Sequence, residues 1–231
     1  MIDVNGLSVK YGDKVVLNDV SIKLAAGIIH GIVGLNGAGK TTFFNALAKT
    51  LKPDAGLIYL NNAPISIRDS AYLETVNYFF SGITGNEYLK IFRQTNPDFN
   101  QHVIQEYFKL PLDELIENYS TGMKKKLAIL SVLKQDKPLF ILDEPFNGLD
   151  LETNKILEII LTTLKQKDKI ILLSSHILEP LLTICDKIHL LENGQFIKTY
   201  ERSDFAGIDE TLFGKLKQDA IVYIASAIGV E

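Results

Sequence analysis

The sequence predicts an α/β fold with a mostly parallel sheet and a helical insertion, and three observations support this class. Apolar runs at 28–33, 139–142 and 170–173 have the pattern of strands that are buried on both faces. The segment 152–165 has helical spacing and lies between the last two runs, which predicts a parallel βαβ crossover. From about 68 to 136 the sequence patterns are those of helices, and strand patterns return only afterwards.

The N-terminal part has the pattern of strands around one helix. Apolar residues at 20, 22 and 24 alternate with polar ones, which is the period of a half-buried strand. A glycine-dense loop at 34–39 precedes helical spacing at 40–49. Residues 57–60 predict a further strand, which Asn61 and Asn62 end in a turn.

Capping and turn signals mark elements in the rest of the chain. Thr84 and Glu87 form a capping-box pattern ahead of one helix. Asp98 is predicted to cap a second helix, whose apolar face would hold Val103, Ile104, Tyr107 and Phe108. The pair Asn193-Gly194 lies between two apolar stretches, so it predicts a type I′ hairpin.

The composition limits the class of protein. The chain has 231 residues, of which 46% are hydrophobic and 23% are charged, as expected for one large globular domain or two small ones. A formal net charge of −4 argues against a general nucleic-acid binder. The single cysteine, Cys185, excludes a disulfide framework within the chain and fits a reducing cytosol.

No apolar stretch reaches the ~20 residues of a membrane-spanning helix. The N-terminus also lacks the basic and apolar regions of a signal peptide. We therefore expect a cytoplasmic protein whose membrane contact comes only through a partner.

A phosphate-binding motif occupies the glycine-dense loop. The pattern G-x-x-x-x-G-K-[ST] is matched in full by Gly34, Leu35, Asn36, Gly37, Ala38, Gly39, Lys40 and Thr41. Glycines let backbone N–H groups surround a phosphate, Lys40 supplies an ammonium and Thr41 offers a hydroxyl to Mg²⁺. Thr42 extends the nucleotide-binding set. The motif predicts nucleotide binding and leaves ATPase, GTPase and kinase open.

A second acidic site follows the apolar run 139–142. A buried strand that ends in Asp143 would deliver a carboxylate to the Mg²⁺ held by Thr41, because strand ends line the ligand crevice of α/β sheets. Glu144, one residue further on, can orient the attacking water.

Four further segments carry a family resemblance. Residues 118–127 (NYSTGMKKKL) resemble the signature of the ATP-binding domain of ABC-type ATPases, in the Tyr-Ser-x-Gly-Met form of many bacterial exporter ATPases. Residues 146–150 resemble the loop that crosses the dimer interface of that family. Ser174-Ser175-His176 resembles the switch-histidine segment, and Tyr11 matches the aromatic that stacks on adenine.

The resemblance implies a P-loop NTPase core with a mostly parallel sheet, an N-terminal antiparallel β part and a helical subdomain. It implies one domain over 1–231, in which 1–67 and 137–200 form the core, 68–136 the helical subdomain and 201–231 a C-terminal extension. It also implies that ATP and Mg²⁺ are the cofactors.

The resemblance assigns roles to the matched residues. Glu144 would be the general base, and His176 would contact the γ-phosphate. Two chains would sandwich two nucleotides, with the ATP of one chain meeting the signature residues of the other, Ser120, Gly122 and Met123.

One family position departs from the pattern. The loop between core and helical subdomain normally carries a glutamine that reaches the metal, but residues 41–93 contain none. The position falls at Glu74 or Thr75, and we favour Glu74 as a metal ligand beside Thr41 and Asp143. The nearby aromatics 78–80 suit either docking to a membrane partner or core packing.

The expected function is the ATP-hydrolysing subunit of an ABC exporter. It would form a homodimer and drive a separate transmembrane permease by ATP-dependent dimerisation, on the inner face of the cell membrane. The alternative is a soluble iron–sulfur assembly ATPase. Several other residues are predicted to have no part in the chemistry: His30, His102 and His189 as structural histidines, Cys185 as a buried hydrophobe, and Lys124, Lys125 and Lys126 as a solvated helical face.

Overall fold

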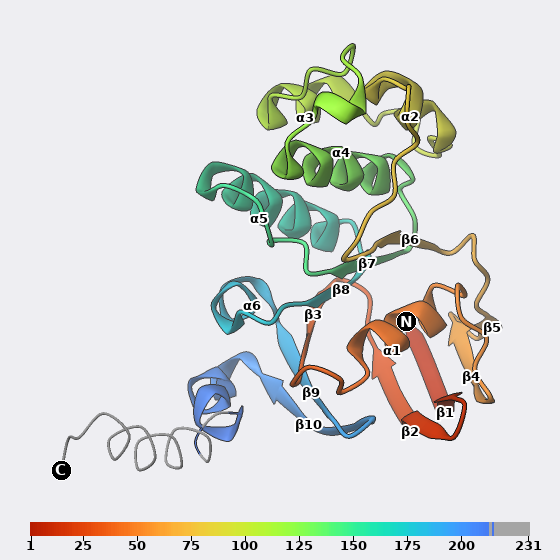
Figure 1. Cartoon of the computed structure of the whole chain (residues 1–231). Helices are drawn as coiled ribbons and strands as arrows, with labels where there is room; N and C mark the ends of the chain where they lie inside the picture. Colours follow the sequence, from red (N-terminus) through yellow and green to blue (C-terminus); the bar gives the residue numbers. More distant parts are fainter. Residues whose placement is uncertain (213, 215–231) are drawn as a thin grey trace, which may run out of the picture.

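A computed structural model describes residues 1–212 and 214, which form two sheets and a group of helices (Figure 1). The first sheet is antiparallel, with strand order β2-β1-β4-β5, and confirms the expected N-terminal β part. Its strands are β1 (Ile2–Tyr11), β2 (Lys14–Leu24), β4 (Ala55–Leu60) and β5 (Ala63–Pro64). In β2 the residues at 20 and 24 are buried while Ser21 and Lys23 are exposed, as the alternation predicted.

The second sheet has the strand order β10-β9-β3-β8-β7-β6. Five of its strands pair in parallel, and only β10 is antiparallel. The strands are β3 (Ile28–Val33), β6 (Ser70–Leu73), β7 (Leu139–Asp143), β8 (Ile170–Ser174), β9 (Lys187–Glu192) and β10 (Gln195–Glu201). The hairpin between β9 and β10 has positive φ at Asn193 (47°) and Gly194 (75°), as a type I′ turn requires.

Helices cover both faces of the second sheet. Helix α1 (Lys40–Leu47) packs between the two sheets, while α5 (Leu151–Gln166) and α6 (Leu178–Ile184) cover the opposite face. Strand β7 shows why the central strands of this sheet are apolar: Phe140 and Leu142 join the core on the α5 side, and Leu139 and Ile141 join the core around α1. Because both faces are buried, the strand is continuously hydrophobic rather than alternating.

A helical subdomain gathers at one end of the molecule (Figure 1, top). It contains α2 (Gly85–Ile91), α3 (Gln101–Phe108), α4 (Thr121–Lys134) and the short 3-10 helix η1 (Ile116–Asn118). A second 3-10 helix, η2 (Arg202–Gly207), follows β10. The predicted capping box is confirmed, since Thr84 and Glu87 exchange both hydrogen bonds at the start of α2.

Two expectations need correction. Asp98 does not cap α3; Asn100 does, because its side chain accepts the His102 N–H while Asp98 lies two residues earlier in a turn of its own. The predicted helical segment also began too early, at 68. Residues 70–73 form β6 and pair with β7 in the core sheet, so the helical part begins after Leu73. Most of the predicted extension 201–231 lies outside the described residues.

The structure separates the three aromatics at 78–80 by burial. The ring of Phe79 packs on Tyr88 with centroids 5.0 Å apart. Tyr78 and Phe80 are instead 84% and 65% exposed. In the part of the chain that the structure describes, no helix combines the length and hydrophobicity that a membrane crossing needs.

Two of the three histidines that were predicted to be structural, His30 and His189, form a buried pair. His30 Nε2 donates to the Ala25 carbonyl at 3.1 Å, which leaves its Nδ1 to accept from His189 Nε2 at 3.0 Å. His189 Nδ1 then accepts the Thr199 hydroxyl at 2.9 Å. Burial lowers the pKa of His30 to about 4, and burial together with His30 lowers the pKa of His189 to about 3. Both rings are therefore neutral at pH 7.

This pair predicts acid sensitivity of folding. The ordinary histidine pKa is 6.5, so the unfolded chain binds these protons first as the pH falls. The pair's full contribution to the free energy of unfolding is present above about pH 6.5. It is lost progressively as the pH falls towards 4, and each unit by which folding lowers a histidine pKa corresponds to about 1.4 kcal/mol. The free energy of unfolding, measured in denaturant between pH 7 and 4, should therefore fall less steeply in His189→Gln than in the natural chain.

The exposed His102 provides the control, and His102→Gln should retain the natural pH dependence. Equal slopes for His189→Gln and the natural chain would show that the pair does not govern the acid response.

Candidate nucleotide-binding site

The phosphate loop joins the end of β3 to the start of α1. Two of its glycines are required by their surroundings. A Cβ at Gly34 would collide with the Leu191 carbonyl oxygen. Gly39 has φ 110°, and a Cβ there would lie 2.9 Å from Leu17. The loop thus reaches its conformation because glycine allows both the close approach and the left-handed backbone.

Lys40, the first residue of α1, turns back over the loop. Its ammonium donates to the carbonyls of Gly34 (2.7 Å) and Leu35 (3.4 Å). Burial lowers the lysine pKa, and the charges of Glu144 and Asp143 oppose that effect. A cation is therefore held against the loop at the N-terminal, positive end of the α1 dipole, and both features attract phosphate.

Asp143 ends β7 and is 2% exposed. Its Oδ2 accepts the Thr41 hydroxyl at 2.8 Å, and its Oδ1 accepts the Ser174 hydroxyl. Strands β3, β8 and β7 are parallel neighbours, so their carboxyl ends bring the loop, Ser174 and Asp143 to one edge. A hydroxyl and a carboxylate are hard oxygen ligands of the kind that Mg²⁺ prefers, so Thr41 and Asp143 fit a magnesium ion.

Glu144 has φ 53°, a left-handed backbone that is uncommon for glutamate. This turn brings its carboxylate to His176, whose Nδ1 lies 2.8 Å from Oε2 and whose backbone N–H donates to the same oxygen at 3.2 Å. The Glu144 backbone N–H donates to Ser174 Oγ at 3.1 Å. The carboxylate is thus oriented beside the metal candidates, as a general base requires.

These groups surround a cavity of about 450 Å³. Most of the predicted residues line it: Asn36, Gly37, Gly39, Lys40, Thr41, Thr42, Asp143, Glu144 and His176. Lys14, Val16, Thr75 and Asn147 complete the wall. Gly34 and Leu35 line a smaller neighbouring cavity with His176, and Ala38 is buried.

Other predicted residues lie away from this wall. At the glutamine position Thr75 lines the cavity, whereas the favoured metal ligand Glu74 is exposed and does not. The reason is that β6 ends at Leu73, and its next side chain faces solvent. Tyr11 is 51% exposed and pairs in the sheet with the cavity residue Lys14. Its stacking role stays a prediction.

The signature residues form the start of α4. Ser120 is the N-cap, and its Oγ accepts the Met123 N–H at 3.2 Å. A Cβ at Gly122 would lie 3.1 Å from the Gly148 carbonyl, so the signature contacts the loop after Glu144. Within the described residues, the cavity wall includes none of the three signature residues, Ser120, Gly122 and Met123. The phosphate loop and the signature therefore occupy separate surfaces of one chain.

Sequence reasoning gave Ser174 no role of its own, although its hydroxyl contacts both acidic residues. A signal was present, because Ser174 directly follows the apolar run 170–173, just as Asp143 follows 139–142. Asn147 lies in the segment 146–150, which the resemblance had matched as a whole without a role for this residue, and Lys14 carried no signal.

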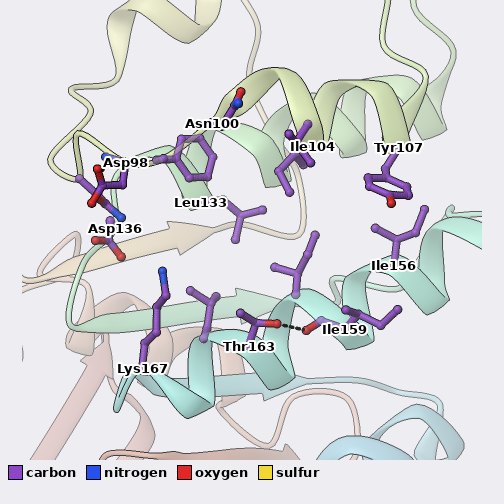
Figure 2. A pocket seen from close by; sticks show the side chains of 15 residues that line it. Asp98, Asn100, Ile104, Tyr107, Leu133, Asp136, Ile156, Ile159, Thr163 and Lys167 are labelled. Atoms are coloured by element: carbon purple, nitrogen blue, oxygen red, sulfur yellow. Dashed lines mark hydrogen bonds between the residues drawn. The ribbon is translucent and has the colours of Figure 1, made fainter.

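A larger cavity, about 500 Å³, lies between α3 and α5 (Figure 2). Ile104 and Tyr107 of α3 lie across it from Ile156 and Ile159 of α5. Its walls are mostly apolar and hold none of the phosphate-loop, acidic or signature residues. Size therefore does not identify the nucleotide site; the convergence of Lys40, Thr41 and Asp143 does.

The fold and this site together define a phosphate-loop nucleotide-binding ATPase core. A family model described as ABC transporter matches residues 17–147. The chain belongs to the ABC transporter family, in which it is an ATP-binding subunit.

Known proteins are similar to this chain over most of its length. The chain is 28% identical to the ABC transporter ATP-binding protein NatA of Bacillus subtilis, over 97% of this chain and 96% of that protein. It is 33% identical to the Nod factor export ATP-binding protein I of Rhizobium leguminosarum bv. viciae, over 85% of this chain and 68% of that protein. A solved ATP-binding subunit of an ABC transporter superposes with a TM-score of 0.81, at 28% identity and 93% coverage of both chains.

The site predicts that ATP binding depends on Lys40. Lys40→Ala removes the ammonium that the loop holds, and a charge-assisted hydrogen bond of this kind corresponds to a loss of roughly 10- to 100-fold in affinity. Isothermal titration with ATP measures the effect, and circular dichroism checks the fold. Lys52→Ala, at an exposed lysine beyond α1, should bind ATP as the natural chain does. Unchanged affinity in Lys40→Ala would refute the site.

Proposed function

We propose that the chain hydrolyses ATP between two copies of itself and thereby drives a separate membrane permease, as the ATPase subunit of an exporter. The observation that carries this proposal is the contact of Glu144 with His176 beside the Thr41–Asp143 pair. The name of the Nod factor export relative supports the export direction. The chain would then lie on the cytoplasmic face of the membrane, held there by the permease.

The chain's own groups account for the chemistry. Lys40 and the loop N–H groups would bind the phosphates, and Tyr11 would stack on the adenine. Mg²⁺, held by Thr41 and Asp143, would neutralise developing phosphate charge. Glu144 would take a proton from the water that attacks the γ-phosphorus, while His176 keeps the Glu144 carboxylate in position.

The separation of the phosphate loop from the signature supports dimerisation. Ser120 caps α4 by accepting the Met123 N–H, and because the first N–H groups of a helix attract anions, we take the start of α4 as an anion site. Because the signature does not line its own chain's cavity, a second copy would have to supply it to a bound nucleotide. A homodimer with two sandwiched ATP molecules satisfies both chains equally.

Permease docking is proposed at the loop between β6 and α2. Val76, Tyr78 and Phe80 are 68%, 84% and 65% exposed, so the loop presents three large apolar side chains to solvent. Clustered exposed apolar groups of this kind mark interaction surfaces. A docked membrane partner explains this exposure, which favours transport over a soluble assembly ATPase.

Hydrolysis should depend on Glu144. Glu144→Gln keeps the shape of the side chain and removes its basicity, so the ATPase rate should fall ~10²–10⁴-fold while ATP still binds. Light scattering should then detect an ATP-dependent dimer, and adding Ser120→Arg should abolish that dimer. Glu158→Gln on α5 is the matched control. Near-normal ATPase activity in Glu144→Gln would contradict the mechanism.

Membrane attachment should depend on the docking loop. The double variant Tyr78→Asp, Phe80→Asp places two charges in the proposed apolar contact, so less of the chain should remain in washed membranes of its native cells. ATP affinity should be unchanged. Ile197→Asp changes a residue of β10 that is 53% exposed and should not alter membrane retention. Equal retention of the double variant and the natural chain would rule out this surface.

A further inference from the structure

The helix that follows His176 is poorly stabilised by its own sequence. Helix α6 has seven residues, well short of the ~12–15 that an isolated helix needs in water. Its N-cap is Ile177, whose side chain has no hydrogen-bonding atom, and its last turn carries no basic residue. The geometry of α6, and with it the path of the chain at His176, therefore depends on contacts with other parts of the fold.

The segment 202–212 supplies contacts at the C-terminal end of α6. The guanidinium of Arg202 donates to the Thr183 carbonyl at 3.1 Å and to the Cys185 carbonyl at 3.3 Å. Thr183 lies in the last turn of α6, where carbonyls have no partner within the helix, and Cys185 is the C-cap. A cation at this end also faces the negative end of the helix dipole. Arg202 thus takes the place of the basic residue that α6 lacks in its last turn.

Apolar packing fixes the same segment against the core. Phe205 and Ile208 are buried, and they belong to the core cluster that contains Leu181 and Ile184 of α6. The 3-10 helix η2, which begins at Arg202, also contacts strands β9 and β10 of the second sheet. Arg202 is therefore held against the sheet while its guanidinium binds α6.

At its other end the segment 202–212 borders the nucleotide site. Leu212 lines the smaller cavity, about 180 Å³, together with Leu178, the first residue of α6, and His176. The phosphate loop supplies another wall of this cavity. The segment therefore lies at both ends of α6, and at one of them it borders the histidine that contacts the candidate general base.

We propose that Arg202 is a positioning residue: by binding the end of α6 it holds the chain at His176 and so keeps that imidazole against the Glu144 carboxylate. Leu212 gives the same segment a second contact at the start of α6. The proposal rests on the proposed ATPase function and assigns a part in it to the segment 202–212. Arg202 touches no reacting atom and acts only through α6 and His176.

The activity test compares Arg202→Met with Arg202→Lys in the purified full chain. Arg202→Met removes both hydrogen bonds to α6 and should lower kcat roughly tenfold while KM for ATP changes little, because a displaced His176 affects the transition state more than ATP binding. Arg202→Lys keeps a cationic donor and should recover part of the lost kcat. Arg93→Met, at an exposed arginine of the helical subdomain, is the matched control and should retain natural kcat.

A spectroscopic measurement tests the position of His176 without relying on turnover. NMR records the imidazole signals of the four histidines, and His176→Gln identifies the signal of His176. In Arg202→Met this signal should move while the His102 signal stays in place. The number of ATP-binding sites per chain, from isothermal titration, should remain natural, which distinguishes displacement of His176 from unfolding.

The proposal is overturned if the His176 signal keeps its natural position in Arg202→Met, if that variant retains natural kcat, or if its kcat falls only in proportion to the number of ATP-binding sites. A natural chain without ATPase activity would instead refute the proposed function, and the His176 signal would still decide whether Arg202 positions the histidine.

Discussion

The carboxylate of Asp143 is the group on which the geometry of the site depends. One oxygen accepts a hydrogen bond from Thr41 at the start of α1, and the other accepts one from Ser174 at the end of β8. Because an unpartnered buried carboxylate would be costly, these two hydroxyls hold the phosphate loop and two strand ends together. The register of β7 and β8, in which Asp143 lies opposite Ser174, makes the arrangement possible.

The segment 144–150 extends this arrangement to the rest of the molecule. It begins at Glu144, which contacts His176, and ends at Asp150, which caps α5 through the Thr153 N–H. Hydrogen bonds from Thr153 and Lys126 hold the pKa of Asp150 well below its usual range. A single short loop thus connects Glu144, the proposed general base, with the signature helix α4 and with α5, which covers the central sheet.

Sequence patterns predicted the features that local chemistry determines, such as the phosphate loop, the buried strands, the capping box and the Asn193-Gly194 hairpin. They were less reliable where competing local or long-range contacts decide the outcome. Asparagine and aspartate both suit an N-cap, so the sequence alone does not distinguish Asn100 from Asp98. In the structure Asn100 caps α3, because its side chain accepts the His102 N–H. The burial of Lys125 and the position of Thr75 depend on how α4 and β6 pack, which a run of lysines or a missing glutamine does not reveal.

The most direct test of this account is the effect of Mg²⁺ on ATP affinity in Asp143→Asn, measured by isothermal titration calorimetry. In the natural chain Mg²⁺ should strengthen ATP binding, because Thr41 and Asp143 would hold the ion against the phosphates. Asp143→Asn should bind ATP without Mg²⁺ as the natural chain does, since Lys40 and the loop remain, and should gain little when Mg²⁺ is added. An equal gain in both chains would contradict the account.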